Sequence, residues 1–277
     1  MIIDIPLFSG LSLKIDDDHH GKKEYPTARL QKGLLLLDHG QELSDEGVGF
    51  GVPVLKKRFK TIFPGEVALT CLRNGPTWEI TAKFKLNLIE KISTRKDEYV
   101  ESRLIYAVKH LLAAMMRRLP FARDLLTSVS SKVRELFNWE TTYAYSNFST
   151  DLEVIYKIDP EIGKLTVEID ANHLPRDITE VVLMNEQGAC VFNQYLDTSG
   201  IALEGEKIGC WDEVNADQAW FASTGHKILF KLSQVKGARL FRGREFIGSR
   251  LAWAGFGYSF PPSIKNIRYE MSIERLT

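Results

Sequence analysis

Two connections in the sequence carry residue types that can transfer protons. The first, 38–46, follows an apolar run and contains Asp38, His39, Glu42, Asp45 and Glu46. A histidine beside carboxylates suits general acid–base chemistry, because a nearby negative charge favours the protonated imidazole. The alternative interpretation is a solvated polar turn, since acids and glycine are typical of exposed connections.

The second connection, from Trp211 to His226, combines acids with aromatic rings. Trp211 and Trp220 bracket Asp212, Glu213 and Asp217. Aromatic faces stack on pyranose rings, and carboxylates accept hydrogen bonds from sugar hydroxyls or transfer protons. The pattern indicates a sugar site, with a polar loop anchored to the core by its tryptophans as the alternative.

These connections supply the candidate site residues. We expect a catalytic acid–base pair to be drawn from His39, Glu42, Asp212, Glu213 and His226, and Trp211 or Trp220 to stack on the ligand. Arg242 and Arg244 are further ligand-binding candidates, in a predicted hairpin centred on Gly243, because guanidinium groups bind carboxylate or phosphate through two hydrogen bonds. A solvated hairpin is the alternative there.

We predict no metal site and no cofactor. The run Asp16 to His20 offers oxygen and nitrogen ligands, but consecutive side chains in a strand point to opposite faces and those in a loop are usually solvated.

The glycines at positions 47, 49 and 51 do not predict a nucleotide loop. Their spacing is G-x-G-x-G, whereas kinases and dinucleotide-binding folds use G-x-G-x-x-G, and the run around Pro53 predicts a strand rather than a helix. Alternate glycines on one face let a ring or another backbone approach closely. We therefore expect strands at Leu34–Leu37 and Val48–Leu55, joined by 38–46.

Composition excludes some classes of function. The 277 residues contain 36 Lys and Arg and 36 Asp and Glu, so no global field attracts nucleic acid. Three distant cysteines, Cys71, Cys190 and Cys210, fit neither a zinc site nor a disulfide scaffold. With no signal-peptide pattern and no apolar run of about 20 residues, we expect a cytoplasmic protein without a transmembrane segment.

Periodicity predicts a mainly β chain. Short apolar or alternating runs dominate before Ser93 and after Thr141, and from Trp78 to Leu88 every second residue is apolar. We expect a single β-rich domain over 1–277, built as a large antiparallel β-sandwich or supersandwich.

One segment departs from this pattern. Between Asp97 and Phe137 the apolar residues recur at helical spacing, and Pro120 divides the segment into two helices or kinks one. We therefore expect a two-helix insertion at about 97–137.

Successive β-runs with acids, histidines and tryptophans in the connections resemble the galactose-mutarotase-like β-supersandwich of aldose epimerases, polysaccharide-lyase domains and some glycoside hydrolases. The resemblance is one of architecture, and it covers the two β regions but not the helical insertion. It implies that a histidine and a carboxylate act as acid and base on a sugar. His173 or His226, with the two acidic connections, would supply that pair here.

Two functions remain open. The first is a carbohydrate-active or carbohydrate-binding protein for a small-molecule or oligosaccharide ligand, with epimerase-like (isomerase) or lyase-like acid–base chemistry. The second is a non-enzymatic β-sandwich or barrel that binds a protein partner or a membrane surface through its amphipathic insertion, which is basic at Arg117, Arg118 and Arg123. A polar-lined concavity should lie beside the acidic connections in the first and under the helices in the second.

Overall fold

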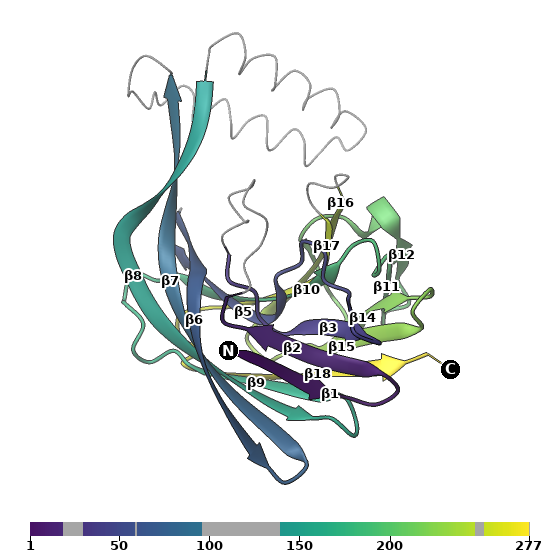
Figure 1. The fold of residues 1–277 in the computed structure, drawn as a ribbon. Coiled ribbons are helices and arrows are strands. Elements are labelled where there is room, and N and C mark those ends of the chain that lie inside the picture. Colours follow the sequence, from purple (N-terminus) through teal and green to yellow (C-terminus); the bar gives the residue numbers. More distant parts are fainter. Residues whose placement is uncertain (19–29, 59, 96–138, 247–251, 277) are drawn as a thin grey trace. The chain divides into compact units, whose positions relative to one another are not determined.

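The computed structural model describes residues 1–18, 30–58, 60–95, 139–246 and 252–276 (Figure 1). The chain divides into two compact units, 1–88 with 148–277, and 89–147. In the second unit, only the strand backbone of 89–95 and 139–147 is described. The insertion expected at 97–137 lies outside the described residues. Within them, no helix has the length and apolar character needed to cross a membrane.

The described strands form two sheets. The smaller has the order β1-β2-β3-β4, with bounds β1 Ile2–Pro6, β2 Leu11–Asp16, β3 Leu35–Asp38 and β4 Gln41–Glu42. The larger has 14 strands in the order β12-β11-β14-β15-β18-β9-β8-β7-β6-β5-β10-β17-β16-β13. Their bounds are β5 Gly49–Lys57, β6 Lys60–Asn74, β7 Thr77–Arg95, β8 Trp139–Asp159, β9 Lys164–Asp170, β10 Glu180–Gly188, β11 Gln194–Asp197, β12 Ala202–Glu204, β13 Asp212–Glu213, β14 Gln218–Ser223, β15 Ile228–Ser233, β16 Arg239–Phe246, β17 Ala252–Phe260 and β18 Asn266–Arg275, with a 3-10 turn, η3, at Gly205–Ile208.

Strand β7 shows how the sequence pattern sets the structure. Its alternate residues Ile80, Ala82, Phe84, Leu86 and Leu88 are buried, because successive side chains of a strand point to opposite faces. The strand pairs antiparallel with β6. The prediction of a mainly β, antiparallel fold is confirmed.

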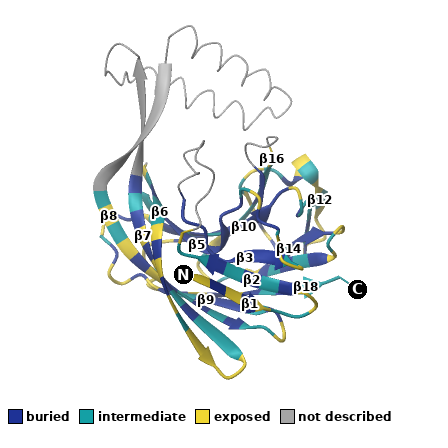
Figure 2. Cartoon of the chain, viewed as in Figure 1, coloured by how far each residue is buried: buried dark blue, intermediate teal, exposed yellow. Residues whose placement is uncertain are grey.

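Aromatic rings fill the core between two parts of the larger sheet. Phe50 of β5 and Phe256 of β17 contact Phe230 of β15, and Phe256 also contacts Phe221 of β14, with ring centroids 4.8 to 5.9 Å apart. Every residue of β17 is buried, so the strand is covered on both faces (Figure 2). Sheet facing sheet over such a core is β-sandwich packing.

The stretch that begins at Leu34 folds as strand, connection and strand, as predicted. The connection between β3 and β5 also contains the two-residue strand β4, which pairs back onto β3. His39 and Gly40 make the turn between β3 and β4 with φ values of 49° and 81°. Positive φ is what tight hairpin turns require.

Gly51 shows why glycines alternate near the start of β5. Its φ is 71°, and the ring of Tyr156 occupies the position of a β-carbon. The Tyr156 hydroxyl donates a hydrogen bond to the Gly51 carbonyl at 3.0 Å. Added β-carbons at Gly47 and Gly49 would lie 2.7 and 2.8 Å from backbone oxygens. The glycines therefore permit close approach, as predicted, and make no phosphate loop.

Candidate functional site

A polar hollow lies where three chain segments around β14 and β15 meet. Its volume is about 290 Å³, and its lining consists of Thr198, Ser199, Asn215, Ala216, Asp217 and Gln234. These residues come from the turn after β11, the segment before β14 and the residue after β15. Part of the lining belongs to the second acidic connection of the sequence.

Hydrogen bonds hold the three segments together. The Thr198 N–H donates to the Gln218 carbonyl at 3.0 Å, and the Gln234 N–H donates to the Asp217 carbonyl at 2.7 Å. The Gln234 side-chain amide donates to the Val214 carbonyl at 3.0 Å. The shape of the hollow is therefore fixed without the side chain of Asp217.

The buried carboxylate of Asp197 shapes the turn that carries Thr198 and Ser199. It accepts hydrogen bonds from the Ser199 N–H at 2.9 Å, the Ser199 hydroxyl at 2.6 Å and the Tyr195 hydroxyl at 2.7 Å. Burial acts to raise the pKa of Asp197, but these hydrogen bonds outweigh it and hold the pKa below its usual value. The turn is therefore organised around an ionised group.

Asn215 and Asp217 give the hollow its binding chemistry. Both side chains are exposed, and neither makes a hydrogen bond or ion pair with a described residue. An amide both donates and accepts, and a carboxylate accepts hydrogen bonds on two oxygens. The hollow thus offers unengaged polar groups suited to a ligand rich in hydroxyls.

Asp38 and His226 bring the two acidic connections into contact at a different place. His226, in the turn between β14 and β15, has its Nδ1 atom 2.9 Å from Oδ2 of Asp38. Arg275 of β18 donates to Oδ1 of Asp38, and donates to the His226 carbonyl at 2.7 Å. The side chain of His39 is 78% exposed, with Nε2 3.9 Å from Oδ1 of Asp38.

Asp38 is an ionised, mostly buried group in this cluster. Its burial acts to raise the pKa, but the hydrogen bonds and charges of His226 and Arg275 outweigh it and hold the pKa below its usual value. A carboxylate on Nδ1 fixes the orientation of the imidazole, as in acid–base dyads. The same contacts also tie β3 to β18.

Strand β14 separates His226 from the polar hollow. Asp217 precedes this six-residue strand and His226 follows it. At a rise of about 3.3 Å per residue, the two ends of the strand lie about 20 Å apart. One small ligand cannot contact both sites.

The predicted acid Glu42 lies in a third place. It accepts a hydrogen bond from Ser44 and lies 3.5 Å from Nζ of Lys32, whose side chain is 5% exposed. Lys32 also donates to the Asp45 carbonyl at 2.9 Å. Glu42 therefore serves as a counter-charge for a buried lysine.

Asp212 and Glu213 form β13, at the edge of the larger sheet. Both are exposed, and they pair with Arg242 and Phe241 of β16. Asp212 is 3.8 Å from the Arg242 guanidinium. The five predicted catalytic residues are thus distributed over three positions and do not converge.

The two predicted tryptophans do not flank one ligand site. The Trp211 ring stacks on Trp253 with centroids 4.8 Å apart, and an added β-carbon at Gly257 would lie 2.9 Å from it. Trp220 is half-buried on β14, in register with Leu196 and Lys231, and does not line the hollow. Trp211 therefore packs against β17 of the larger sheet.

The hairpin predicted around Gly243 is wrong. Gly243 lies inside β16 opposite Gly255. An added β-carbon there would lie 2.8 Å from the Trp253 ring, so the residue provides space for an aromatic ring and makes no turn.

The predicted arginines bind the protein's own backbone. Arg242 donates to the Ile208 carbonyl at 3.2 Å, and its guanidinium lies 4.8 Å from the centre of the Tyr195 ring. Arg244 donates to the Ala189 carbonyl at 3.0 Å. Both guanidinium groups are already engaged in the fold.

Glu186 is a buried carboxyl group that the sequence analysis did not single out. It is 4% exposed on β10, and the Val48 N–H donates to it at 3.4 Å. Burial, with a contribution from the charge of Glu245, raises the pKa of Glu186 to about 8. The signal in the sequence is an acid in an apolar strand, and such a group can hold a proton at neutral pH.

The three other candidate histidines have separate outcomes. His173 is exposed, and its Nε2 lies 3.0 Å from the Asp151 carbonyl. His19 and His20 lie outside the described residues. Among the residues described, no group of three or more His, Cys, Asp or Glu side chains is arranged to hold a metal ion.

Comparison with solved structures identifies a similar fold. The sequence itself matches no protein-family model and no curated protein. Two structures of α-N-acetylgalactosaminidase NagBb from Bifidobacterium bifidum, complexes with GalNAc and with Gal-NHAc-DNJ, align with 99% of this chain at TM-scores of 0.52 and 0.51 and 10% identity. The likeness is in the fold. The chain spans 36% of that enzyme's length.

A galactose mutarotase-like protein from Clostridium acetobutylicum also aligns with the whole chain, at a TM-score of 0.38 and 8% identity. The fold shared with part of the α-N-acetylgalactosaminidase agrees with the β-sandwich architecture expected from the sequence.

Proposed function

We propose that the protein binds a carbohydrate in the polar hollow between β11, β14 and β15. The observation that supports this most directly is a 290 Å³ hollow lined by hydroxyl, amide and carboxylate side chains. The likeness of the fold to part of an enzyme solved with GalNAc is in keeping with it.

Asp217 and Asn215 would supply recognition. The Asp217 carboxylate can accept hydrogen bonds from two neighbouring ring hydroxyls, and charge-assisted hydrogen bonds are the stronger ones. The Asn215 amide can donate to one hydroxyl and accept from another. Asp217 therefore contributes more affinity than Asn215 in this proposal.

The test is a titration with N-acetylgalactosamine, galactose and glucose, in which binding is monitored through the amide NMR signals of the protein. We expect saturable shifts at the residues that line the hollow, and affinity about tenfold weaker in Asp217→Asn. Asp212→Asn is the matched control, because Asp212 is an exposed acid on β13 that does not line the hollow. Equal affinities of the two variants, or no shift in the hollow with any sugar, would refute the proposal.

Acid–base chemistry on a sugar is a second candidate, and the 2.9 Å contact between His226 and Asp38 favours it. If His226 transfers a proton, His226→Gln should lower turnover of the substrate about 10²- to 10⁴-fold. The Asp217→Asn variant should leave that turnover unchanged, since the hollow lies at the other end of β14. A rate unaffected by His226→Gln would leave only the binding function.

A further inference from the structure

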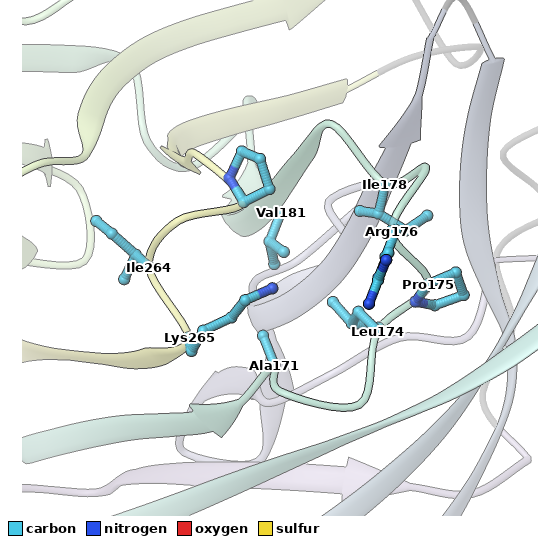
Figure 3. A pocket seen from close by; sticks show the side chains of 9 residues that line it. Ala171, Leu174, Pro175, Arg176, Ile178, Val181, Ile264 and Lys265 are labelled. Atoms are coloured by element: carbon cyan, nitrogen blue, oxygen red, sulfur yellow. The ribbon is translucent and has the colours of Figure 1, made fainter.

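A second hollow with an apolar floor lies where the β9–β10 connection meets the β17–β18 connection (Figure 3). The floor consists of Ala171, Leu174, Ile178 and Val181, which are 2 to 8% exposed. The Ala171 N–H donates to the Lys265 carbonyl at 2.7 Å, which joins the two connections. The hollow is therefore formed in advance of any ligand.

Two cations stand on either side of this floor. In Figure 3 the Lys265 ammonium and the Arg176 guanidinium face the same space from opposite walls. Neither side chain makes a hydrogen bond or ion pair with a described residue. The nearby carboxylate of Asp177 is engaged with Lys57 at 2.7 Å. Within the described part of the chain, the two positive charges have no counter-ion.

The volume of the hollow limits the apolar part of a ligand. It is about 40 Å³. A single water needs about 10–15 Å³, and an apolar cavity of about 150 Å³ accommodates benzene. One methyl group, free or at the end of an isopropyl group, therefore fits the floor, and an aromatic ring does not.

We propose that this hollow binds a small aliphatic carboxylate. A methyl group of the ligand lies on the apolar floor, and the carboxylate lies between Lys265 and Arg176. A guanidinium pairs with a carboxylate through two parallel hydrogen bonds, and an ammonium adds a second charge. The apolar floor favours this ligand over an inorganic anion. The site is independent of the proposed carbohydrate function.

Isobutyrate is the probe, and isobutyramide is its neutral control of the same shape. In a methyl NMR titration, isobutyrate should give saturable shifts at Leu174, Ile178 and Val181. Isobutyramide should bind about tenfold more weakly, because it lacks both ion pairs. Added salt should weaken the binding of isobutyrate and leave the binding of isobutyramide unchanged.

Substitution of the cations locates the carboxylate. Lys265→Met and Arg176→Met keep the aliphatic stems and should each weaken isobutyrate about threefold, and the double variant about tenfold. Lys207→Met, at an exposed lysine of η3, is the matched control and should change nothing. Equal binding of the two compounds, no isobutyrate shifts at the floor, or an unchanged affinity in the double variant overturns the proposal.

Discussion

The Nδ1 atom of His226 and the Oδ2 atom of Asp38 lie 2.9 Å apart, although 188 positions separate the residues in the sequence. Asp38 ends a strand of the smaller sheet, and His226 lies in a turn of the larger one. This contact, with Arg275 on the same carboxylate, ties the two sheets together.

A double-mutant cycle with Asp38→Asn and His226→Gln should give a coupling energy of about 1 kcal/mol at pH 7. The pKa of Asp38 is lowered in the folded protein, so its contribution is present above about pH 4 and is lost as the pH falls through the folded pKa. Chemical denaturation of the four proteins at pH 7 and pH 3 measures both effects. If the two substitutions change the free energy of unfolding additively at pH 7, the contact contributes nothing to stability.

Glu186 should make the protein less stable as the pH rises from about 4.5 to about 8. Its folded pKa is about 8, so the folded state keeps a proton that the unfolded state releases above its ordinary value of 4.5. The free energy of unfolding should fall by up to about 1.4 kcal/mol per pH unit in that window. Glu186→Gln should remove this slope, and urea denaturation at several pH values checks it. If the slope persists in the variant, another titratable group causes it.

Glu42→Gln should destabilise the protein by about 1–2 kcal/mol, because the charge of buried Lys32 loses its 3.5 Å partner. Burial lowers the pKa of Lys32, and the charge of Glu42 opposes that shift. The variant should therefore lower this pKa further. Glu204→Gln, at an exposed position of β12, is the control and should have no effect on the urea midpoint.

Gly51→Ala should lower the free energy of unfolding by about 3 kcal/mol, because residue 51 has a positive φ and the added β-carbon would contact the Tyr156 ring. Gly75→Ala is the matched control: its φ is 64°, but no atom lies within 4 Å of an added β-carbon. It should cost about 1 kcal/mol. Thermal denaturation measures the stability of both variants. Equal losses of stability would mean that the Tyr156 ring moves aside without an energetic penalty.

The strands could be predicted because period-two alternation maps directly onto burial. Ile80 to Leu88 shows this, since each alternate residue is apolar in the sequence and buried in the structure. The sequence likewise predicts the connection at 38–46, but not the turn at His39 and Gly40 or the strand β4 inside it. The residue types of that turn tolerate positive φ.

The site could be predicted only in part, because sequence spacing does not show which connections become neighbours. Asp38 meets His226 through the order of strands in two sheets, and no local pattern encodes that order. Gly243 was wrongly predicted to form a turn. The sequence alone does not distinguish a glycine that leaves room for an aromatic ring from a glycine that makes a turn. Asp217, noted among the acids near the tryptophans, proved to line the polar hollow.

The position of β18 has a consequence for how the protein is made. This strand, residues 266–275, lies between β15 and β9 in the larger sheet, and it carries Arg275 to Asp38. During synthesis, β9 and β15 therefore each have one unpaired edge until residues 266–275 have been made. Pairing over such long sequence separations is slow and exposes unpaired edges to other chains.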